Sequence, residues 1–319
     1  MKLTPIREFQ ENATIQGFFL CREKHVKTTK AGDLYLDLVL QDATGHIPAK
    51  IWDQVDHYRH LFESGDPIAA KGIVEKYSGV LQLNCSHVAK ATSERYGRYG
   101  FNEDLLIPTI EEDRRELWKT LLGLISGIRN KPLKGLLREI FKTYKQTIML
   151  LPASITYHHP ERGGFLKHLV STGEIAVLLA QHYPRIDGDL LLAGVLLHDI
   201  GKVRGLSPGL EGGYTEEGQL IGHLVLGRDI LRETVQQIDN FPPELNLRLE
   251  HIIVAHQGSA PDGSPRPPKF PEALLVHMID RLDGRLDLMF REIESDIGED
   301  PFTDARNPFH TALWKHYQK

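Results

Sequence analysis

Residues 190–202, LLLAGVLLHDIGK, form an apolar run that ends in His198 and Asp199, followed closely by Gly201 and Lys202. Apolar side chains drive such a segment into a protein core, so the run predicts a buried helix. An unpaired carboxylate is costly to desolvate in that environment. The sequence therefore predicts that another group compensates Asp199 at the end of this helix.

Four more histidine or aspartate side chains fall among apolar residues of predicted helices. They are His168, beside Thr172, Ile175 and Leu179; His223, in EGQLIGH; His256, beside Leu249, Ile252 and Ile253; and Asp280, which borders a stripe of Leu275, Ile279, Leu282 and Leu286. This helical spacing turns them toward the core. Taken singly, such a histidine is more often a hydrogen-bonded core residue, and Asp280 fits a helix cap or an ion pair. Four histidines and two aspartates facing one interior instead predict a bound cation.

The overall composition is that of an ordinary folded protein of 319 residues, with 41% hydrophobic and 25% charged residues. A net charge of -5 gives no general attraction to nucleic acid, so a polyanion would need a local basic patch or a metal centre. The 16 histidines are consistent with metal sites.

The two cysteines, Cys21 and Cys85, form neither a CxxC pair nor a disulfide framework. We therefore expect a protein of the reducing cytoplasm. The N-terminal residues MKLTPIREFQ have no signal-peptide core, and the longest apolar run is shorter than the about 20 residues that a membrane span needs. No membrane association is expected.

Residues 14 to about 91 show the two-residue period of β-strands. In DLYLDLVLQD, residues 33–42, Leu34, Leu36, Leu38 and Leu40 share one face. Five strands are predicted, over about 14–28, 34–41, 46–52, 67–77 and 80–90, with a short helix between the third and the fourth. This order is that of the five-stranded OB-fold barrel. The stretch DATGHIPAKIWD, residues 42–53, resembles the hairpin between the second and third strands of nucleic-acid-binding OB-folds.

Residues 93–109 break this periodicity and are predicted to be a linker. From residue 110 to residue 319 the apolar spacing is helical, with helices expected over 110–129, 132–146, 164–182, 188–199, 216–238, 244–257 and 271–295. The Pro-rich residues 258–271 are expected to be a long loop, and loops of that length are commonly functional or disordered. The predicted fold is multidomain α+β, with an OB-fold barrel over 1–92 and an all-α domain over 110–319.

The order H…HD…H…H…D, with HDIGK in the middle, resembles the HD-domain superfamily of metal-dependent phosphohydrolases. Together with the predicted barrel, the chain is similar along nearly its whole length to the YhaM-type 3′-to-5′ exoribonucleases. The motifs that carry this resemblance are HHPERGGFLKHLVS, LLAGVLLHDIGKV, EEGQLIGH, HIIVAHQG, GSPRPPK and HMIDRLDGRLD. One position departs from it: the family often has HHG where this chain has His256, Gln257 and Gly258. If the second histidine of that pair is the ligand, the second metal site here is weakened.

The resemblance implies two metal ions. His168, His198, Asp199 and Asp280 would hold one ion, and Asp199 would bridge to a second ion held by His223 and His256. Imidazole and carboxylate ligands suit Mn²⁺, Fe²⁺, Co²⁺ or Ni²⁺, with Mn²⁺ expected here, and the lack of cysteine ligands argues against a thiolate zinc site. Two such ions about 3.5–4 Å apart can share a hydroxide that attacks a phosphodiester.

Several cations and aromatic residues are candidates for contact with the nucleic acid. Lys202 is expected to meet a phosphate oxygen in the transition state, or else to be an exposed cationic cap on the helix dipole. Tyr35, Lys50 and Trp52 would lie on the barrel face opposite the leucine row, where single strands stack on aromatic rings; a plain exterior or interdomain contact is the alternative. Arg266 and Lys269, in the Pro-rich loop, fit phosphate contacts and solvated loop charges equally well.

The predicted function is metal-dependent hydrolysis of single-stranded RNA from its 3′ end, extended to single-stranded DNA. One alternative is an HD-type phosphohydrolase of small nucleotides that uses the OB-fold for assembly. Another is a single-strand-binding protein with an inactive HD domain. The intact set of His168, His198, Asp199 and Asp280 argues against the second alternative. Self-association as a homo-oligomer is left open.

Overall fold

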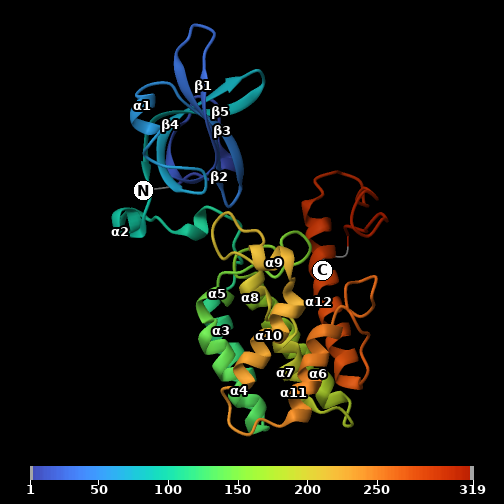
Figure 1. Cartoon of the computed structure of the whole chain (residues 1–319). Coiled ribbons are helices and arrows are strands. Elements are labelled where there is room, and N and C mark those ends of the chain that lie inside the picture. The colour runs from blue at the N-terminus through green and yellow to red at the C-terminus, as the bar shows by residue number, and fades with distance from the viewer. Residues whose placement is uncertain (1–2, 317–319) are drawn as a thin grey trace. The chain divides into compact units, whose positions relative to one another are not determined.

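The computed structural model describes residues 3–316, and these form two compact units (Figure 1). One unit comprises Met1–Thr109 with Gly209–Glu211, and the other comprises Ile110–Pro208 with Gly212–Lys319. The first contains all five long strands and the second contains the long helices. No helix within residues 3–316 is long and apolar enough to cross a membrane.

The first unit is a closed five-stranded barrel with the OB-fold strand order. Its strands are β1 (Thr14–Thr28), β2 (Leu34–Asp42), β3 (Gly45–Ile51), β4 (Pro67–Tyr77) and β5 (Val80–Lys90), arranged β1-β2-β3-β5-β4. Helix α1 (Val55–Tyr58) lies between β3 and β4 in the chain. Every strand pair is antiparallel except β3 with β5. The predicted OB-fold is confirmed.

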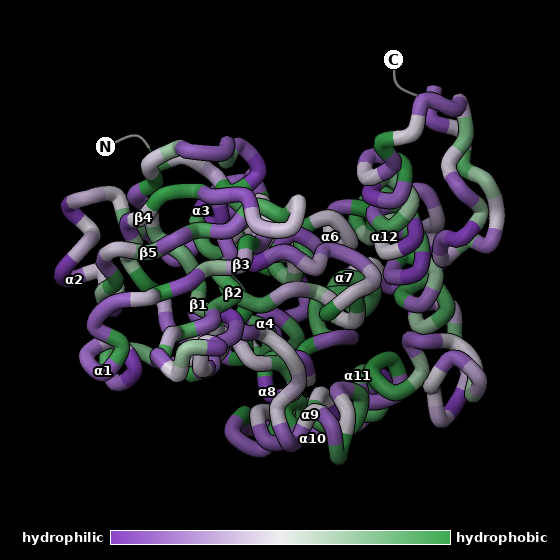
Figure 2. The backbone as a smooth tube through the Cα atoms, turned by 90° about the horizontal axis from the view of Figure 1, so that it is seen from above, coloured by the Kyte–Doolittle hydropathy of each residue, from purple (hydrophilic) through white to green (hydrophobic). Residues whose placement is uncertain are grey.

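Alternation along each strand fills the barrel with one set of side chains. On β2, Leu36, Leu38 and Leu40 are buried, whereas Leu34, the first residue of the strand, is exposed. Figure 2 shows the change between hydrophobic and hydrophilic residues along the barrel strands. Gly72 marks an irregular register between β4 and β5, where a Cβ would lie 2.2 Å from the backbone oxygen of Asn84. A side chain at this position would therefore disrupt the barrel.

Residues 93–109, the predicted linker, contain short helical turns and pack against the barrel. They contain α2 (Ser93–Tyr96) and two short 3₁₀ turns, Gly97–Tyr99 and Glu103–Leu105. Phe101 and Leu106 are buried in a small apolar cluster with Phe18 and Leu20 of β1. The ring centroids of Phe18 and Phe101 lie 5.1 Å apart. This packing was not visible in the sequence because it depends on apolar residues of a distant strand.

The second unit is helical, as predicted. Its helices are α3 (Arg114–Gly127), α4 (Lys131–Thr143), α5 (Lys145–Ile148), α6 (Gly164–His182), α7 (Gly188–Leu197), α8 (Lys202–Gly205), α9 (Glu216–Leu220), α10 (His223–Val235), α11 (Pro243–Ala255) and α12 (Pro271–Ser295). The predicted helix over 216–238 is broken at Gly222, which has a φ of 81°. Helix α7 is buried from Leu190 onward and packs against α4, α6, α11 and α12, so it forms the centre of the unit.

The buried face of α12 differs from the expected stripe. Ile279 is buried and Leu275 packs against the core, as expected, but Leu282 and Leu286 are exposed. The core side of the helix carries Val276 and Asp283 as well. A carboxylate takes a core position here because histidines of other segments hydrogen-bond it. The leucines were expected to be buried because their spacing is helical, but spacing alone does not determine which face a helix turns to its neighbours.

Candidate metal centre

Asp199 lies at the centre of the histidine cluster, two residues after the end of α7. It is 2% exposed, and its Oδ1 lies 3.4 Å from both His223 Nε2 and His256 Nε2. Its Oδ2 lies 3.4 Å from His198 Nε2 and accepts a hydrogen bond from Lys202 Nζ. The end of α7, the start of α10 and the end of α11 therefore meet at one carboxylate.

Asp280 of α12 and His168 of α6 complete the group. His168 Nε2 lies 3.3 Å from His198 Nε2, and both nitrogens approach Asp280 Oδ1, at 3.4 Å and 3.5 Å. All six residues that the sequence singled out as ligands are thus brought together from five segments. Two imidazole nitrogens that face each other at this distance need a shared cation or proton between them.

Hydrogen bonds on the far side of two rings leave Nε2 free to bind a metal. His198 Nδ1 lies 2.6 Å from the carbonyl oxygen of Val195, and His256 Nδ1 lies 2.8 Å from that of Ile253. A carbonyl oxygen can only accept, so each Nδ1 carries the proton. Nε2 is therefore the nitrogen of His198 and His256 that faces Asp199, as in histidines that bind a metal through Nε2.

Two buried polar atoms in the cluster have no hydrogen-bond partner among the described residues. They are Asp199 Oδ1 and His158 Nε2. Leaving such atoms unpaired costs free energy. Potential ligand atoms of His158, His168, Asp199 and Asp280 lie within 4.8 Å of one another, as do those of His198, Asp199 and His256. The donor set and its unpaired atoms fit a divalent cation.

The pKa values of the histidines reflect burial against nearby carboxylates. Burial lowers the pKa of His223 to about 4, and burial with the charges of Lys202 and His168 lowers that of His158 to about 3. Burial opposes the charged form of His198 too, but Asp199 and Asp280 outweigh it and raise its pKa to about 10. Without a cation, the proton on His198 therefore balances the two carboxylates, and metal binding would displace it.

Glycine permits the close approach that places His223 beside Asp199. A Cβ at Gly201 would lie 1.9 Å from the backbone oxygen of His223 and 2.5 Å from the nitrogen of Gly227. Helix α10 can therefore begin directly against the HDIGK turn only when residue 201 is glycine. The Gly201 that follows the histidine–aspartate pair has a structural role in assembling the centre.

Lys202 and Gln257 take positions that the sequence left open. Lys202 is not an exposed cap, because its side chain is 12% exposed and pairs with Asp199. Gln257 Nε2 lies 3.2 Å from His223 Nε2, so the amide supports the ring of His223. His256, and not Gln257, faces Asp199. That His256 is the ligand of the pair stays a prediction.

Sequence reasoning missed a supporting group on the far side of His168. Asp283 Oδ2 lies 2.8 Å from His168 Nδ1 and 3.0 Å from His159 Nε2. His159 also lies 3.0 Å from Asp287, and its backbone has a φ of 41°. Two sequence patterns could have pointed to this group: the HH pair at 158–159 and the four-residue repeat in DRLDGRLD. Each pattern is local, however, and neither shows that the two segments contact each other in the fold.

The other nucleic-acid candidates are distributed over both units. The rings of Tyr35 and Trp52 stack with centroids 4.7 Å apart, and Lys50 Nζ lies 5.4 Å from the Tyr35 centroid while pairing with Asp37. Trp52 is 42% exposed. Arg266 and Lys269 are exposed in the loop before α12. Neither lines the two cavities beside the cluster.

Two cavities of about 330 Å³ and 340 Å³ flank the cluster. Tyr157, His158 and Gln257 line both of them, and so form a partition. The first cavity also contains Lys202 and His223. The second is lined by the following residues: His256, Asp262, His277, Asp280, Arg281, Gly284, Arg285, Leu288, Pro308 and Phe309.

Comparison with known proteins identifies relatives of the whole chain. A family model described as HD domain matches residues 165–285, a range that includes all six predicted ligands. The chain is 33% identical over 280 residues to the 3′-5′ exoribonuclease YhaM of Bacillus subtilis, covering 88% of each protein. It is 30% identical to that of Listeria monocytogenes, again covering 88% of each. The second OB-fold domain of replication protein A from Methanococcus maripaludis is 19% identical, with a TM-score of 0.24 over 28% of this chain and 94% of that one.

Proposed function

The chain belongs to the family of YhaM 3′-5′ exoribonucleases, and on this premise we propose which of its residues perform the reaction. It is a metal-dependent hydrolase that shortens single-stranded RNA from the 3′ end. The observation that carries our assignment is the cluster of four histidines and two aspartates around Asp199. Its buried Oδ1 lies 3.4 Å from His223 Nε2 and His256 Nε2 and has no hydrogen bond from the described residues.

We assign two divalent ions to the cluster, with Mn²⁺ as the preferred ion because the ligands are imidazole and carboxylate. His168, His198, Asp199 and Asp280 would hold one ion. Asp199, His223 and His256 would hold the other. Bound there, divalent ions lower the pKa of the attacking water and stabilise charge on the phosphodiester.

The chain's own residues position the substrate and balance its charge. Lys202 lies beside Asp199 and lines the first cavity, so its ammonium is available to a non-bridging phosphate oxygen as negative charge accumulates. Gln257 and His158 line both cavities, and we assign the scissile phosphate a position between the two. Arg266 and Lys269 are assigned to phosphates farther along the strand.

The barrel would hold the single strand through Tyr35 and Trp52, with Lys50 beside them. Stacking on an aromatic ring tolerates every base and does not require a 2′-hydroxyl. Single-stranded DNA should therefore bind as well as RNA. In this division of labour, residues 1–92 bind the strand, residues 93–109 connect, and residues 110–319 cleave.

We place the enzyme in the cytoplasm. Cys21 and Cys85 are both buried free thiols. Burial raises the pKa of each thiol to about 12, so both stay protonated and unreactive. The barrel therefore does not depend on a disulfide formed in an oxidising compartment.

Digestion of 5′-labelled single-stranded RNA, resolved on a sequencing gel, tests the proposal. With Mn²⁺ we expect a ladder of products shortened one nucleotide at a time from the 3′ end, and with a chelator we expect none. A 3′-labelled copy should release its label as a mononucleotide. Internal cuts, or digestion that persists in chelator, would contradict the assignment.

A further inference from the structure

The second cavity beside the metal cluster is lined by three kinds of side chain that suit a nucleotide: candidate metal ligands, arginines and an aromatic ring. His158, His256 and Asp280 of the cluster line it, together with Arg281 and Arg285 of α12. Phe309, from the segment that follows α12, lines it as well. Its volume of about 340 Å³ falls within the range of about 300–1,000 Å³ of small-molecule sites.

Arg281 and Arg285 are exposed and form no ion pair with a carboxylate of the described residues. Other arginines of this unit are paired, such as Arg291 with Asp287 and Arg232 with Glu250. The repeat RLD at 281–283 and 285–287 explains the difference. Residues four apart share a helix face, so both arginines face the cavity and both aspartates face His159.

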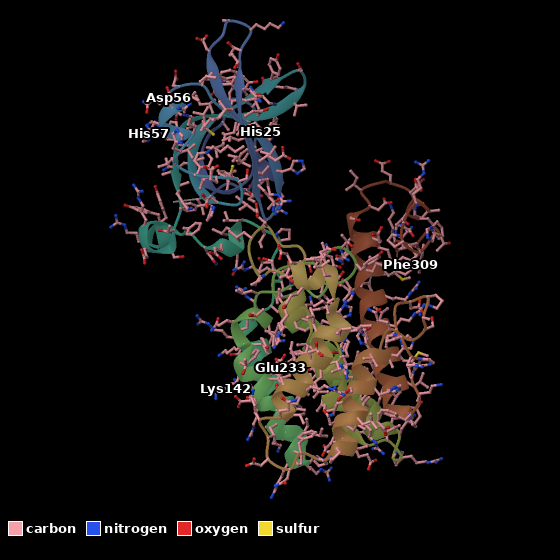
Figure 3. All side chains as sticks on the ribbon, viewed as in Figure 1. His25, Asp56, His57, Lys142, Glu233 and Phe309 are labelled. Atoms are coloured by element: carbon pink, nitrogen blue, oxygen red, sulfur yellow. The ribbon has the colours of Figure 1, made fainter. Side chains whose placement is uncertain are left out.

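Phe309 is held by a folded segment. Asn307 is buried, and its Nδ2 donates to the carbonyl oxygens of Asp304 and Thr311, each at 2.7 Å. Its Oδ1 accepts from the backbone nitrogen of Phe309 at 2.9 Å. The guanidinium of Arg285 lies 5.1 Å from the centroid of the Phe309 ring. Figure 3 shows Phe309 on the C-terminal segment beside α12.

We infer that this cavity binds one of the two nucleotides flanking the scissile bond, an inference that rests on the proposed function. The base of this nucleotide would stack on Phe309, and its phosphate would lie against Arg281 and Arg285. The wall shared with the metal cluster places this nucleotide next to the reacting phosphate. Stacking on a phenylalanine ring accepts any base. Contacts between guanidinium groups and phosphates carry no base preference. The site therefore favours a nucleotide over other anions without selecting a sequence.

The inference is tested by measuring KM for Phe309→Ala and for the unsubstituted protein. The substrates are intact RNA and RNA with an abasic nucleotide at the terminal or the penultimate position. For the unsubstituted protein, we expect the abasic residue at one of these positions to raise KM about tenfold, the size of one lost stacking contact. Phe309→Ala should raise KM by the same factor on intact RNA and be insensitive to the abasic residue. Equal sensitivity of both proteins at both positions would overturn the inference.

Two controls show whether an effect of Phe309→Ala comes from lost nucleotide binding or from a change in the metal centre or the fold. Phe302→Ala removes an exposed ring from the same segment that lines neither cavity, and should leave KM unchanged. The number of bound Mn²⁺ ions and the circular dichroism spectrum should be equal for Phe309→Ala and the unsubstituted protein. A lower metal content would show instead that Phe309 supports the fold of the centre.

The arginines are tested by binding in chelator, where no turnover occurs. Replacing both, as Arg281→Gln with Arg285→Gln, should reduce the salt dependence of affinity for a short oligoribonucleotide, because two phosphate contacts are lost. If the dependence of affinity on salt concentration is unchanged, the two arginines do not contact the phosphates. If the unsubstituted protein fails to shorten intact RNA with Mn²⁺, the proposed function itself fails, whatever the abasic comparison shows.

Discussion

His168 Nδ1 lies 2.8 Å from Asp283 Oδ2, while the Nε2 of the same ring lies 3.3 Å from His198 Nε2. One carboxylate therefore fixes the orientation of a ring whose other nitrogen faces the cluster. Ser171 and His159 also hydrogen-bond Asp283, so the carboxylate itself is held from three sides. Such outer contacts typically orient metal ligands.

Asp283→Asn is expected to weaken metal binding about 10–100-fold, because an amide does not hold His168 in the ligating tautomer as a carboxylate does. Calorimetric titration with Mn²⁺ measures the change directly. Asp229→Asn, which removes an exposed carboxylate of α10, is the control and should leave the affinity unchanged. Equal affinities for both variants would show that Asp283 has only a structural role.

Asp199→Asn should abolish turnover and leave the fold intact, because the amide preserves shape but removes the charge that both ions share. We expect a loss of more than about a hundredfold, since a ligand contributes more than its supporting residues. Hydrolysis of labelled RNA with Mn²⁺ gives the loss, and circular dichroism checks the fold. Activity near that of the unsubstituted protein would exclude a dinuclear site at Asp199.

His256→Ala should release one metal ion and cut activity strongly, whereas Gln257→His should leave the metal content unchanged. His256 Nε2 lies 3.4 Å from Asp199 Oδ1, while the amide of Gln257 contacts His223 instead. Native mass spectrometry counts the bound ions. An unchanged count for the alanine variant, or an additional ion for the histidine variant, would assign the ligand to position 257.

Trp52→Ala in the full chain should weaken binding of single-stranded RNA about tenfold, because one stacking surface is lost. Hydrolysis of a small phosphodiester should be unaffected, since it needs no strand platform. Fluorescence polarisation in chelator measures the affinity. Tyr77→Ala, which removes another exposed aromatic side chain of the barrel, is the matched control. If both variants bind equally well, Tyr35 and Trp52 are not the platform.

Glu250→Gln should destabilise the helical unit by about 2 kcal/mol at neutral pH. Arg228 and Arg232 donate to Glu250 at 3.0 Å and 2.8 Å. Burial opposes ionisation of Glu250, but these hydrogen bonds outweigh it and lower its pKa. A carboxyl whose pKa is lowered by folding stabilises the fold above its unfolded pKa and loses that contribution as pH falls through the folded pKa.

Thermal unfolding across a range of pH checks the prediction for Glu250. The difference in Tm between Glu250→Gln and the unsubstituted protein should amount to several degrees at neutral pH and shrink in acid. Glu244→Gln, which breaks an exposed pair with Arg248, should change Tm little at any pH. A Tm difference that is independent of pH would mean that packing, and not charge, explains the effect.

The sequence by itself predicted the strands, most of the long helices and the residues of the histidine–aspartate cluster. Strands β1, β4 and β5 and helices α6 and α12 have the predicted bounds, because alternation and helical spacing are local properties of the chain. The six predicted ligands meet for a related reason. Each polar residue lies on or beside the apolar face of its own helix, and those faces share one core.

Only the tertiary structure decided which partners these residues have. His159 and Asp283 are 124 positions apart in the chain, and neither local pattern indicates the other. The face that α12 buries and the packing of residues 93–109 were likewise settled by neighbours from other segments. Periodicity in the sequence indicates whether a side chain is buried or exposed. The contacts of that side chain depend on how distant elements pack, and packing is a property of the whole fold.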